Sequence, residues 1–136
     1  MRIFVVAVGR LRAPYLDDVA HYTRLLRRHA RLELVEVRDD DAVAARIPQR
    51  AFVSLLDVDG EALDSLSFSA FIEQRRASGR DLCFVIGGPF GGPALERLDH
   101  RLSLGAFTLP HQLARVVLLE QIFRAHKLIA GEPYHH

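Results

Sequence analysis

The sequence has few of the features that mark several classes of protein. Its 136 residues include one cysteine and no tryptophan, and no group of histidines and cysteines has zinc-binding spacing. A single cysteine cannot form an internal disulfide, so we expect the protein to lie in a reducing compartment. Because Cys83 lies in the apolar run LCFVI, we expect its side chain to be buried. No apolar stretch reaches the length of a membrane span, and that of MRIFVVAVGR is too short for a signal peptide. We therefore expect a soluble, cytoplasmic protein without a metal site.

An excess of one charge is also absent: the sequence has 18 basic and 17 acidic residues, which gives a net charge of +1. A chain so close to neutrality indicates no class of partner by its overall field. Any surface that binds nucleic acid would have to be a local patch. The length favours a single domain, residues 1–136, and suffices for a core without disulfides or metals.

What the sequence does have is a regular alternation of two apolar patterns. Apolar runs predict strands at residues 3–9, 32–37, 52–58, 82–86 and near 103–109. Helical spacing predicts helices at 14–29, 67–78, 93–99 and from Pro110 onward, while 39–50 fits a short helix or a loop. We expect Asp59-Gly60 to form a turn that ends the third strand, and Ser67 to cap the helix that follows. The alternation predicts an α/β fold with a mostly parallel sheet sandwiched by helices.

A glycine-rich segment, FVIGGPFGG, follows the most hydrophobic predicted strand directly. Ligands of open α/β sheets bind at the carboxyl ends of strands, where glycines allow close backbone approach. The segment matches neither of the common nucleotide-binding loops, and a tight turn explains it equally well. Two other strand ends, at Leu56-Asp57 and at Leu104 to Leu109, would meet the same edge. Together the three loops could hold a flat apolar ring such as adenine, or they could be ordinary loops.

The last predicted helix is apolar on almost every side, as its run LARVVLLEQIFRAHKLI shows. A short helix of this kind is usually covered by its own sheet on one side and by a partner on the other. We therefore expect a homodimer with an isologous contact. Arg115 and Arg124 lie within this helix, and for each alone an ion pair with Glu120 or another carboxylate is the favoured explanation.

Basic residues also gather on the first predicted helix, where Arg24, Arg27 and Arg28 have helical spacing. Such a cluster could contact phosphates, although a solvated helix face is the simpler interpretation. The remaining histidines outside the last helix, His21, His29 and His100, have no recognisable partners and are expected at the surface.

Four segments, taken in order, resemble one family. They are VAVGRL, LLDVDG, FVIGGPFG and FTLPHQLARVVLLEQIFRAHKLIAGEPYH, and the last is the most specific. The chain resembles the bacterial 23S ribosomal RNA methyltransferases that act on N3 of a pseudouridine, which belong to the SPOUT, or α/β-knot, superfamily. The chain is shorter than typical members, and the missing length falls around residues 39–50.

The resemblance implies a deep trefoil knot near the C-terminus, S-adenosylmethionine as the methyl donor, a homodimer, and RNA of the assembled ribosome as substrate. It also implies which residues contact the donor: Leu56, Gly87, Leu104, Gly105, Ala106, Phe107, Thr108 and Leu109. Two alternatives remain, a SPOUT methyltransferase for another RNA nucleoside and a dimeric ribosome-binding protein without catalysis.

The catalytic residues that the resemblance implies are Arg124, His111, Tyr134 and His135. Arg124 would stabilise negative charge on the base or bind phosphate, and His135 would relay a proton. His136 stands where family members commonly have Arg or Lys, so it is either a weaker anion-binding residue or part of an added tag.

Overall fold

Five strands form one fully parallel sheet in the computed structural model, which describes residues 1–89 and 92–134. Their order across the sheet is β2-β1-β4-β3-β5, and each neighbouring pair is parallel. All carboxyl ends therefore lie at the same edge. This arrangement confirms the predicted α/β fold with a parallel sheet. The strands are β1 (Arg2–Val8), β2 (Arg31–Val37), β3 (Phe52–Ala62), β4 (Leu82–Ile86) and β5 (His100–Ser103).

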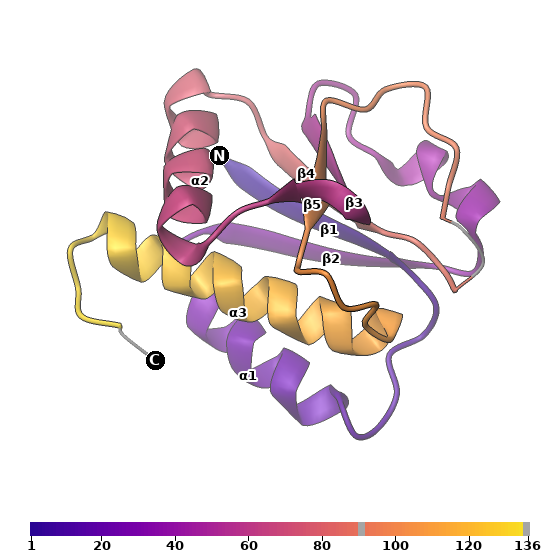
Figure 1. The fold of residues 1–136 in the computed structure, drawn as a ribbon, viewed down its shortest axis with the longest axis horizontal. Coiled ribbons are helices and arrows are strands. Elements are labelled where there is room, and N and C mark those ends of the chain that lie inside the picture. The colour runs from indigo at the N-terminus through magenta and orange to yellow at the C-terminus, as the bar shows by residue number, and fades with distance from the viewer. Residues whose placement is uncertain (90–91, 135–136) are drawn as a thin grey trace.

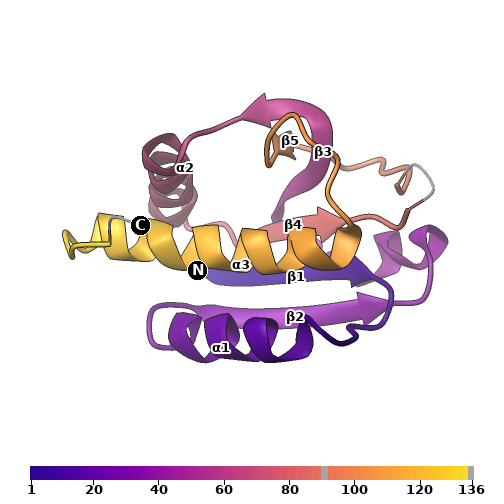
Figure 2. The same ribbon diagram turned by 60° about the horizontal axis from the view of Figure 1, so that its bottom comes forward.

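Three α-helices cover one face of the sheet, with α3 (His111–Ile129) between α1 (Leu16–Leu26) and α2 (Ser65–Ser78), as Figures 1 and 2 show. The main hydrophobic core lies between these helices and the sheet, and includes Phe84 of β4 and Leu118 of α3, both fully buried. None of the helices in the described part of the chain is long and apolar enough to cross a membrane.

The opposite face of the sheet has a thinner cover than the prediction of a helix sandwich suggests. Two 3-10 turns, η1 (Asp40–Ala42) and η2 (Ala44–Arg46), lie on this face, and the fully buried Val43 between them belongs to a second core. Leu95 and Leu98, from the irregular segment before β5, pack against the same core. The Asp39 carboxylate accepts a hydrogen bond from the Ala42 N–H at 3.0 Å, and this capping favours short turns over a longer helix.

Two local predictions around β3 are wrong. Asp59-Gly60 does not end the strand, because β3 continues to Ala62 after a shift of register between Leu56 and Glu61. Gly60 serves close packing instead, since a Cβ there would lie 2.7 Å from the backbone of Arg101 in β5. The cap of α2 is Asp64, not Ser67: the Asp64 carboxylate accepts the Ser67 N–H at 2.7 Å. Gly79, in the left-handed conformation, ends that helix as expected.

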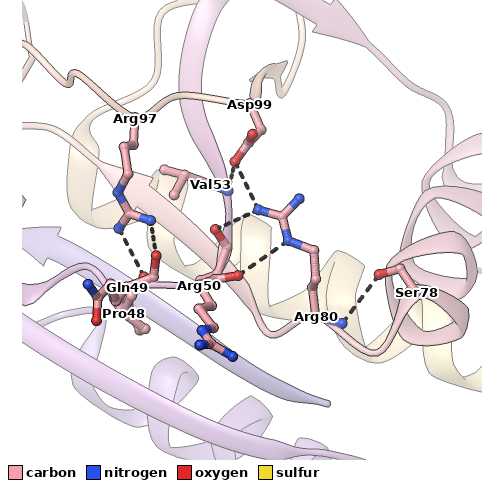
Figure 3. Close-up of polar contacts among 9 residues, drawn as sticks. Pro48, Gln49, Arg50, Val53, Ser78, Arg80, Arg97 and Asp99 are labelled. Atoms are coloured by element: carbon pink, nitrogen blue, oxygen red, sulfur yellow. Dashed lines mark hydrogen bonds and ion pairs between the residues drawn. The ribbon is translucent and has the colours of Figure 1, made fainter.

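The helix predicted at residues 93–99 is also absent, because hydrogen bonds hold this segment against the start of β3 (Figure 3). The Arg97 guanidinium donates to the carbonyls of Pro48 and Gln49. Asp99 bonds twice to Val53, with its carboxylate accepting at 2.8 Å and its N–H donating at 3.0 Å.

As a consequence, β5 begins at His100 rather than near residue 103, and residues 104–109 form a loop. His100, which we expected at the surface, is mostly covered. Its Nδ1 lies 2.8 Å from the Ser54 hydroxyl, and only 15% of its side chain is exposed.

Candidate active site

The middle of β3, at its shift of register, and the loops that follow β4 and β5 surround one cavity of about 590 Å³ at the carboxyl edge of the sheet. Seven of the eight residues that the resemblance assigns to the methyl donor line this cavity: Leu56, Gly87, Leu104, Gly105, Phe107, Thr108 and Leu109. Ala106 lies on the same loop but is not a lining residue. The cavity thus brings together three segments that are separated by up to about fifty residues in the sequence.

Gly87 occupies the tightest point of the loop after β4. A Cβ at this position would lie 2.7 Å from the Cα of Gly92 and 2.9 Å from the Cδ of Pro93. The two arms of the loop therefore approach each other so closely that only glycine fits between them. This contact shapes the floor of the cavity with backbone rather than with side chains.

The segment that joins β2 to β3 supports this loop from behind. The Asp40 carboxylate accepts the N–H of Gly88 at 2.9 Å, and the same oxygen would lie 3.5 Å from a Cβ at Gly87. The sequence pattern gave no sign of this contact, because Asp40 and Gly88 are 48 residues apart. Asp40 thereby links the segment that we expected to be shortened to the glycine loop.

A pair of opposite charges lies on the cavity wall. The Arg101 guanidinium donates to the Asp57 carboxylate at 2.8 Å, and both residues line the cavity. The N–H of Asp59, together with Arg101, holds the pKa of Asp57 below its ordinary value. The cavity therefore offers a carboxylate and a guanidinium beside apolar walls, and it suits a ligand that carries both charges. Sequence reasoning had missed Arg101, because the pairing of β5 with β3 could not be foreseen.

The start of α3 is clamped to the loop after β1. Gln112 donates to the carbonyl of Arg10 and accepts the N–H of Arg12, both at 2.8 Å. Arg115, 3% exposed, donates to the carbonyl of Gly9 at 3.1 Å and to Glu36 at 2.6 Å. Glu36 of β2 is the carboxylate partner expected for Arg115.

Burial opposes ionisation of Glu36. Its carboxylate nevertheless accepts hydrogen bonds from Arg115 and from the Leu11 N–H, and these lower the pKa of Glu36. The clamp also places His111, the first residue of α3, on the cavity wall. A Cβ at Gly9 would lie 3.4 Å from His111 Nε2, so this glycine leaves room for the imidazole. Of the three implied catalytic residues within the described part of the chain, His111 is the one that borders this cavity.

Arg124 and Tyr134 form a separate cluster. Arg124 bonds through Nε and Nη2 to Glu120 Oε1, at 3.0 and 2.6 Å, and its Nη1 donates to the carbonyl of Tyr134 at 3.3 Å. The guanidinium also lies 4.5 Å above the Tyr134 ring. The ion pair with Glu120 is the one that the sequence favoured. His135 lies outside the described residues.

Tyr22 of α1 belongs to the surroundings of this cluster. Burial, joined by the charges of Tyr134 and Glu120, raises the pKa of Tyr22, so its phenol stays neutral. The cluster lies thirteen residues along α3 from His111, or about 20 Å at about 1.5 Å per residue. One chain therefore does not bring all its implied catalytic residues together.

Comparisons with known proteins identify the family of this chain. A family model described as a predicted SPOUT methyltransferase matches residues 1–135. A protein of Carboxydothermus hydrogenoformans named Ribosomal RNA large subunit methyltransferase H is 40% identical over 158 aligned positions that cover 99% of each chain. A protein of the same name from Solidesulfovibrio magneticus is 42% identical, and the alignment covers 97% of both chains. Another, from Listeria monocytogenes, is 37% identical, and the alignment covers 99% of both chains.

The alignment with the Carboxydothermus protein is longer than the 136 residues of this chain, so that relative carries residues which are missing here. The family match over residues 1–135, with relatives that align from end to end, shows that this chain belongs to the SPOUT methyltransferases.

Proposed function

We propose that this protein transfers a methyl group from S-adenosylmethionine to N3 of a pseudouridine in large-subunit ribosomal RNA. The observation that carries the proposal is the cavity at the carboxyl edge, lined by seven of the donor residues that the resemblance implies. The relatives that bear the name of a large-subunit ribosomal RNA methyltransferase support the choice of substrate. The proposal places the enzyme in the cytoplasm, with the assembled ribosome as its target and residues 1–136 as a single domain.

The residues around the cavity fit S-adenosylmethionine by size and by chemistry. The cavity has a volume of about 590 Å³, which is ordinary for a pocket that holds a ligand of this class. Leu56, Leu104 and Leu109 provide apolar walls for an adenine ring, while the Gly87 loop provides backbone groups. Asp57 and Arg101 would bind the ammonium and carboxylate of the methionine end. When bound, the donor supplies an electrophilic methyl group on its sulfonium.

The chemistry then requires that N3 of the base lose its proton and that the flanking carbonyl oxygens carry negative charge. His111, on the cavity wall, is placed to accept a proton beside the donor. Arg124 would stabilise the charge on the base, and the bond to Glu120 holds its guanidinium in one orientation. Tyr134 stacks on the same guanidinium and would orient the base or the adjoining phosphate.

His111 and the cluster of Arg124 and Tyr134 can act on one base only if two protomers share the site. A partly exposed stripe runs the length of α3 and offers a contact surface in which Leu113, Val117 and Leu128 are apolar and Gln121 is polar. In a two-fold dimer built on this stripe, the far end of one α3 faces the start of the other. Arg124 and Tyr134 of one protomer would then complete the donor cavity of its partner.

We also propose that the chain is knotted, as the resemblance implies. After β5, at one edge of the sheet, the chain crosses to the ends of β1 and β2, where Gln112 and Arg115 bind Arg10 and Gly9. This path passes the Gly87 loop on the same edge of the sheet. Such a crossing is what threading of the C-terminal segment through that loop would require.

The test uses large ribosomal subunits from a strain that lacks the modification. The purified protein is incubated with these subunits and with S-adenosylmethionine labelled on its methyl group, and the RNA is digested to nucleosides. We expect N3-methylpseudouridine by mass spectrometry. Label on another nucleoside would refute the proposed target, and absence of label from RNA would refute the proposed activity.

A further inference from the structure

Four arginines meet in a second hollow, of about 600 Å³, at the amino edge of the sheet. They are Arg2 of β1, Arg27 and Arg28 after α1, and Arg31 of β2. We call these four residues the basic hollow. The starts of β1 and β2 lie at the end of the sheet opposite to the start of α3, as Figure 2 shows. At about 3.3 Å per residue, the seven residues of β1 separate this hollow from the donor cavity by roughly 20 Å.

Three of the four arginines of the basic hollow are not used in ion pairs, whereas Arg2 is paired with Asp81. Among the described residues, no ion pair involves Arg27, Arg28 or Arg31. Other arginines near this edge behave differently: Figure 3 shows Arg80 and Arg97 donating to backbone carbonyls of residues 48–51. The hollow thus keeps guanidinium groups available to solvent.

The acidic residues nearby do not neutralise the hollow. Asp81 is the carboxylate that lines it, and one of its oxygens already accepts the N–H of Arg2 at 2.8 Å. Its other oxygen lies 3.8 Å from the Arg2 guanidinium. Glu33 lines the adjoining depression, which it shares with Arg2, Arg27 and Arg31, and among the described residues it forms no ion pair with them. The end of α1 favours a nearby cation, but this effect does not explain Arg2 and Arg31, which come from strands.

We propose that the basic hollow binds phosphates of the RNA backbone and forms a second contact with the substrate, remote from the donor cavity of its own chain. The inference rests on the proposed function, because it takes RNA as the substrate. Guanidinium groups bind phosphate through two parallel hydrogen bonds, and several in one concave surface suit a folded RNA strand. With a net charge of only +1, the protein has no general attraction for RNA, so a local surface of this kind is needed.

The hollow also adjoins the Arg124 and Tyr134 cluster. His29, on its rim, has its ring 5.7 Å from that of Phe123, which in turn lies 5.2 Å from the Tyr134 ring. Any arrangement that brings Arg124 of one protomer to its partner's donor cavity therefore brings the basic hollow of that protomer to the same RNA. The phosphates in question would be those that flank the methylated nucleotide.

The test compares two triple variants with the same change of charge. Arg27→Gln, Arg28→Gln and Arg31→Gln remove the hollow, whereas Arg38→Gln, Arg46→Gln and Arg50→Gln remove exposed arginines of the segment between β2 and β3. The dissociation constant for a transcript of large-subunit ribosomal RNA is measured as a function of KCl concentration. Removing one arginine that binds a phosphate lowers the slope of log affinity against log salt by about 0.7–0.9.

We expect the hollow variant to lose about two units of slope, which is on the order of a hundredfold in affinity at about 0.1 M salt. The control variant should lose less than about fivefold. Unchanged RNA binding by the hollow variant, or an equal loss in both variants, would overturn the inference. Uridine monophosphate that binds the hollow as tightly as RNA would overturn it too, since the site would then be a nucleotide pocket.

Two further measurements separate this inference from the proposed function. Donor titration and thermal melting should be the same for both variants and the natural protein, which shows that neither the fold nor the donor cavity has changed. If the natural protein methylates ribosomal RNA and the hollow variant binds it normally, only the inference fails. If the natural protein methylates no RNA but the hollow variant loses RNA binding, the proposed function fails and the inference stands.

Discussion

Replacing Gly87 by alanine adds one methyl group at the point where the two arms of the loop after β4 meet. The new Cβ would lie 2.7 Å from the Cα of Gly92 and 2.9 Å from the Cδ of Pro93. Ordinary contacts of this kind begin at 3.4 Å, so the arms must separate by roughly 0.7 Å. Because both contacts are with the loop itself, the strain is expected to deform the cavity floor rather than the core.

The size of the effect follows from the cost of overpacking. Forcing an extra methyl group into a well-packed place costs about 1–3 kcal/mol. If bound donor requires the natural loop shape, this cost appears as weaker binding, and each 1.4 kcal/mol or so is a factor of about ten. We therefore expect S-adenosylmethionine to bind Gly87→Ala about ten- to a hundredfold more weakly than it binds the natural protein.

Calorimetric titration with S-adenosylmethionine measures this change directly. The matched control is Gly88→Ala, where the Cβ would lie 3.1 Å from Cγ1 of Val8, a side chain that can yield by a few tenths of an ångström. We expect the control to bind the donor within about fivefold of the natural protein. Both variants should keep the solution mass of the natural protein, because neither glycine lies on α3.

The reasoning would be refuted if Gly87→Ala bound the donor as tightly as the natural protein does. It would also be refuted if Gly88→Ala lost as much affinity as Gly87→Ala, because the effect would then come from loop rigidity in general. A thermal melt of each variant distinguishes a deformed loop from an unfolded protein. Loss of the cooperative transition in either variant would show that the glycine serves the fold and not the donor site alone.

Four other outcomes follow from the same structure. Arg124→Ala should lower kcat on the order of a hundredfold and leave donor affinity within about twofold, and equal losses in steady-state kinetics and titration would indicate a structural role. Asp40→Ala should weaken donor binding about five- to tenfold because the Gly88 N–H loses its acceptor, whereas Asp40→Asn keeps an oxygen there and should bind normally. The pKa of Glu36 is lowered from its ordinary value of 4.5. The ionised carboxylate therefore stabilises the fold above that pH, and this stabilisation is lost as the pH falls through the folded pKa. Glu36→Gln should flatten the acid side of a plot of melting temperature against pH. Burial raises the pKa of Cys83 to about 12, so the native thiol should not react with a thiol reagent near pH 8, and rapid modification of the folded protein would contradict its burial.

The sequence predicted the sheet well because its strands are continuous apolar runs. Residues 3–9 and 82–86 became the central strands β1 and β4, whose side chains are buried on both faces. The start of α3 was also foreseen, since Pro110 stands directly before its first residue. For the site, the gathering of the three loops at one edge follows from parallel strands alone, and the structure shows it.

The errors arose where a distant contact outweighs a local preference. Asp59-Gly60 is a good turn dipeptide, yet the backbone of β5 lies so close to Gly60 that the chain stays extended beside it. Residues 93–99 have helical spacing, yet Arg97 bonds to the segment before β3 and Asp99 bonds to the start of β3. A short window of sequence gives neither the pairing register of β5 nor the distant carbonyl to which an arginine donates. For the same reason sequence analysis missed Asp40, whose role depends on a loop 48 residues away.

The clamp of Gln112 and Arg115 on the loop after β1 joins residues that are 100 to 106 positions apart. One wall of the donor cavity, with His111, therefore takes shape only after almost the whole chain has been synthesised and α3 has packed. A nascent chain that still lacks its last helix has four or five strands to pair but no complete place for the donor. Completion of this cavity thus depends on the last helix, which is the last element of the fold to be synthesised.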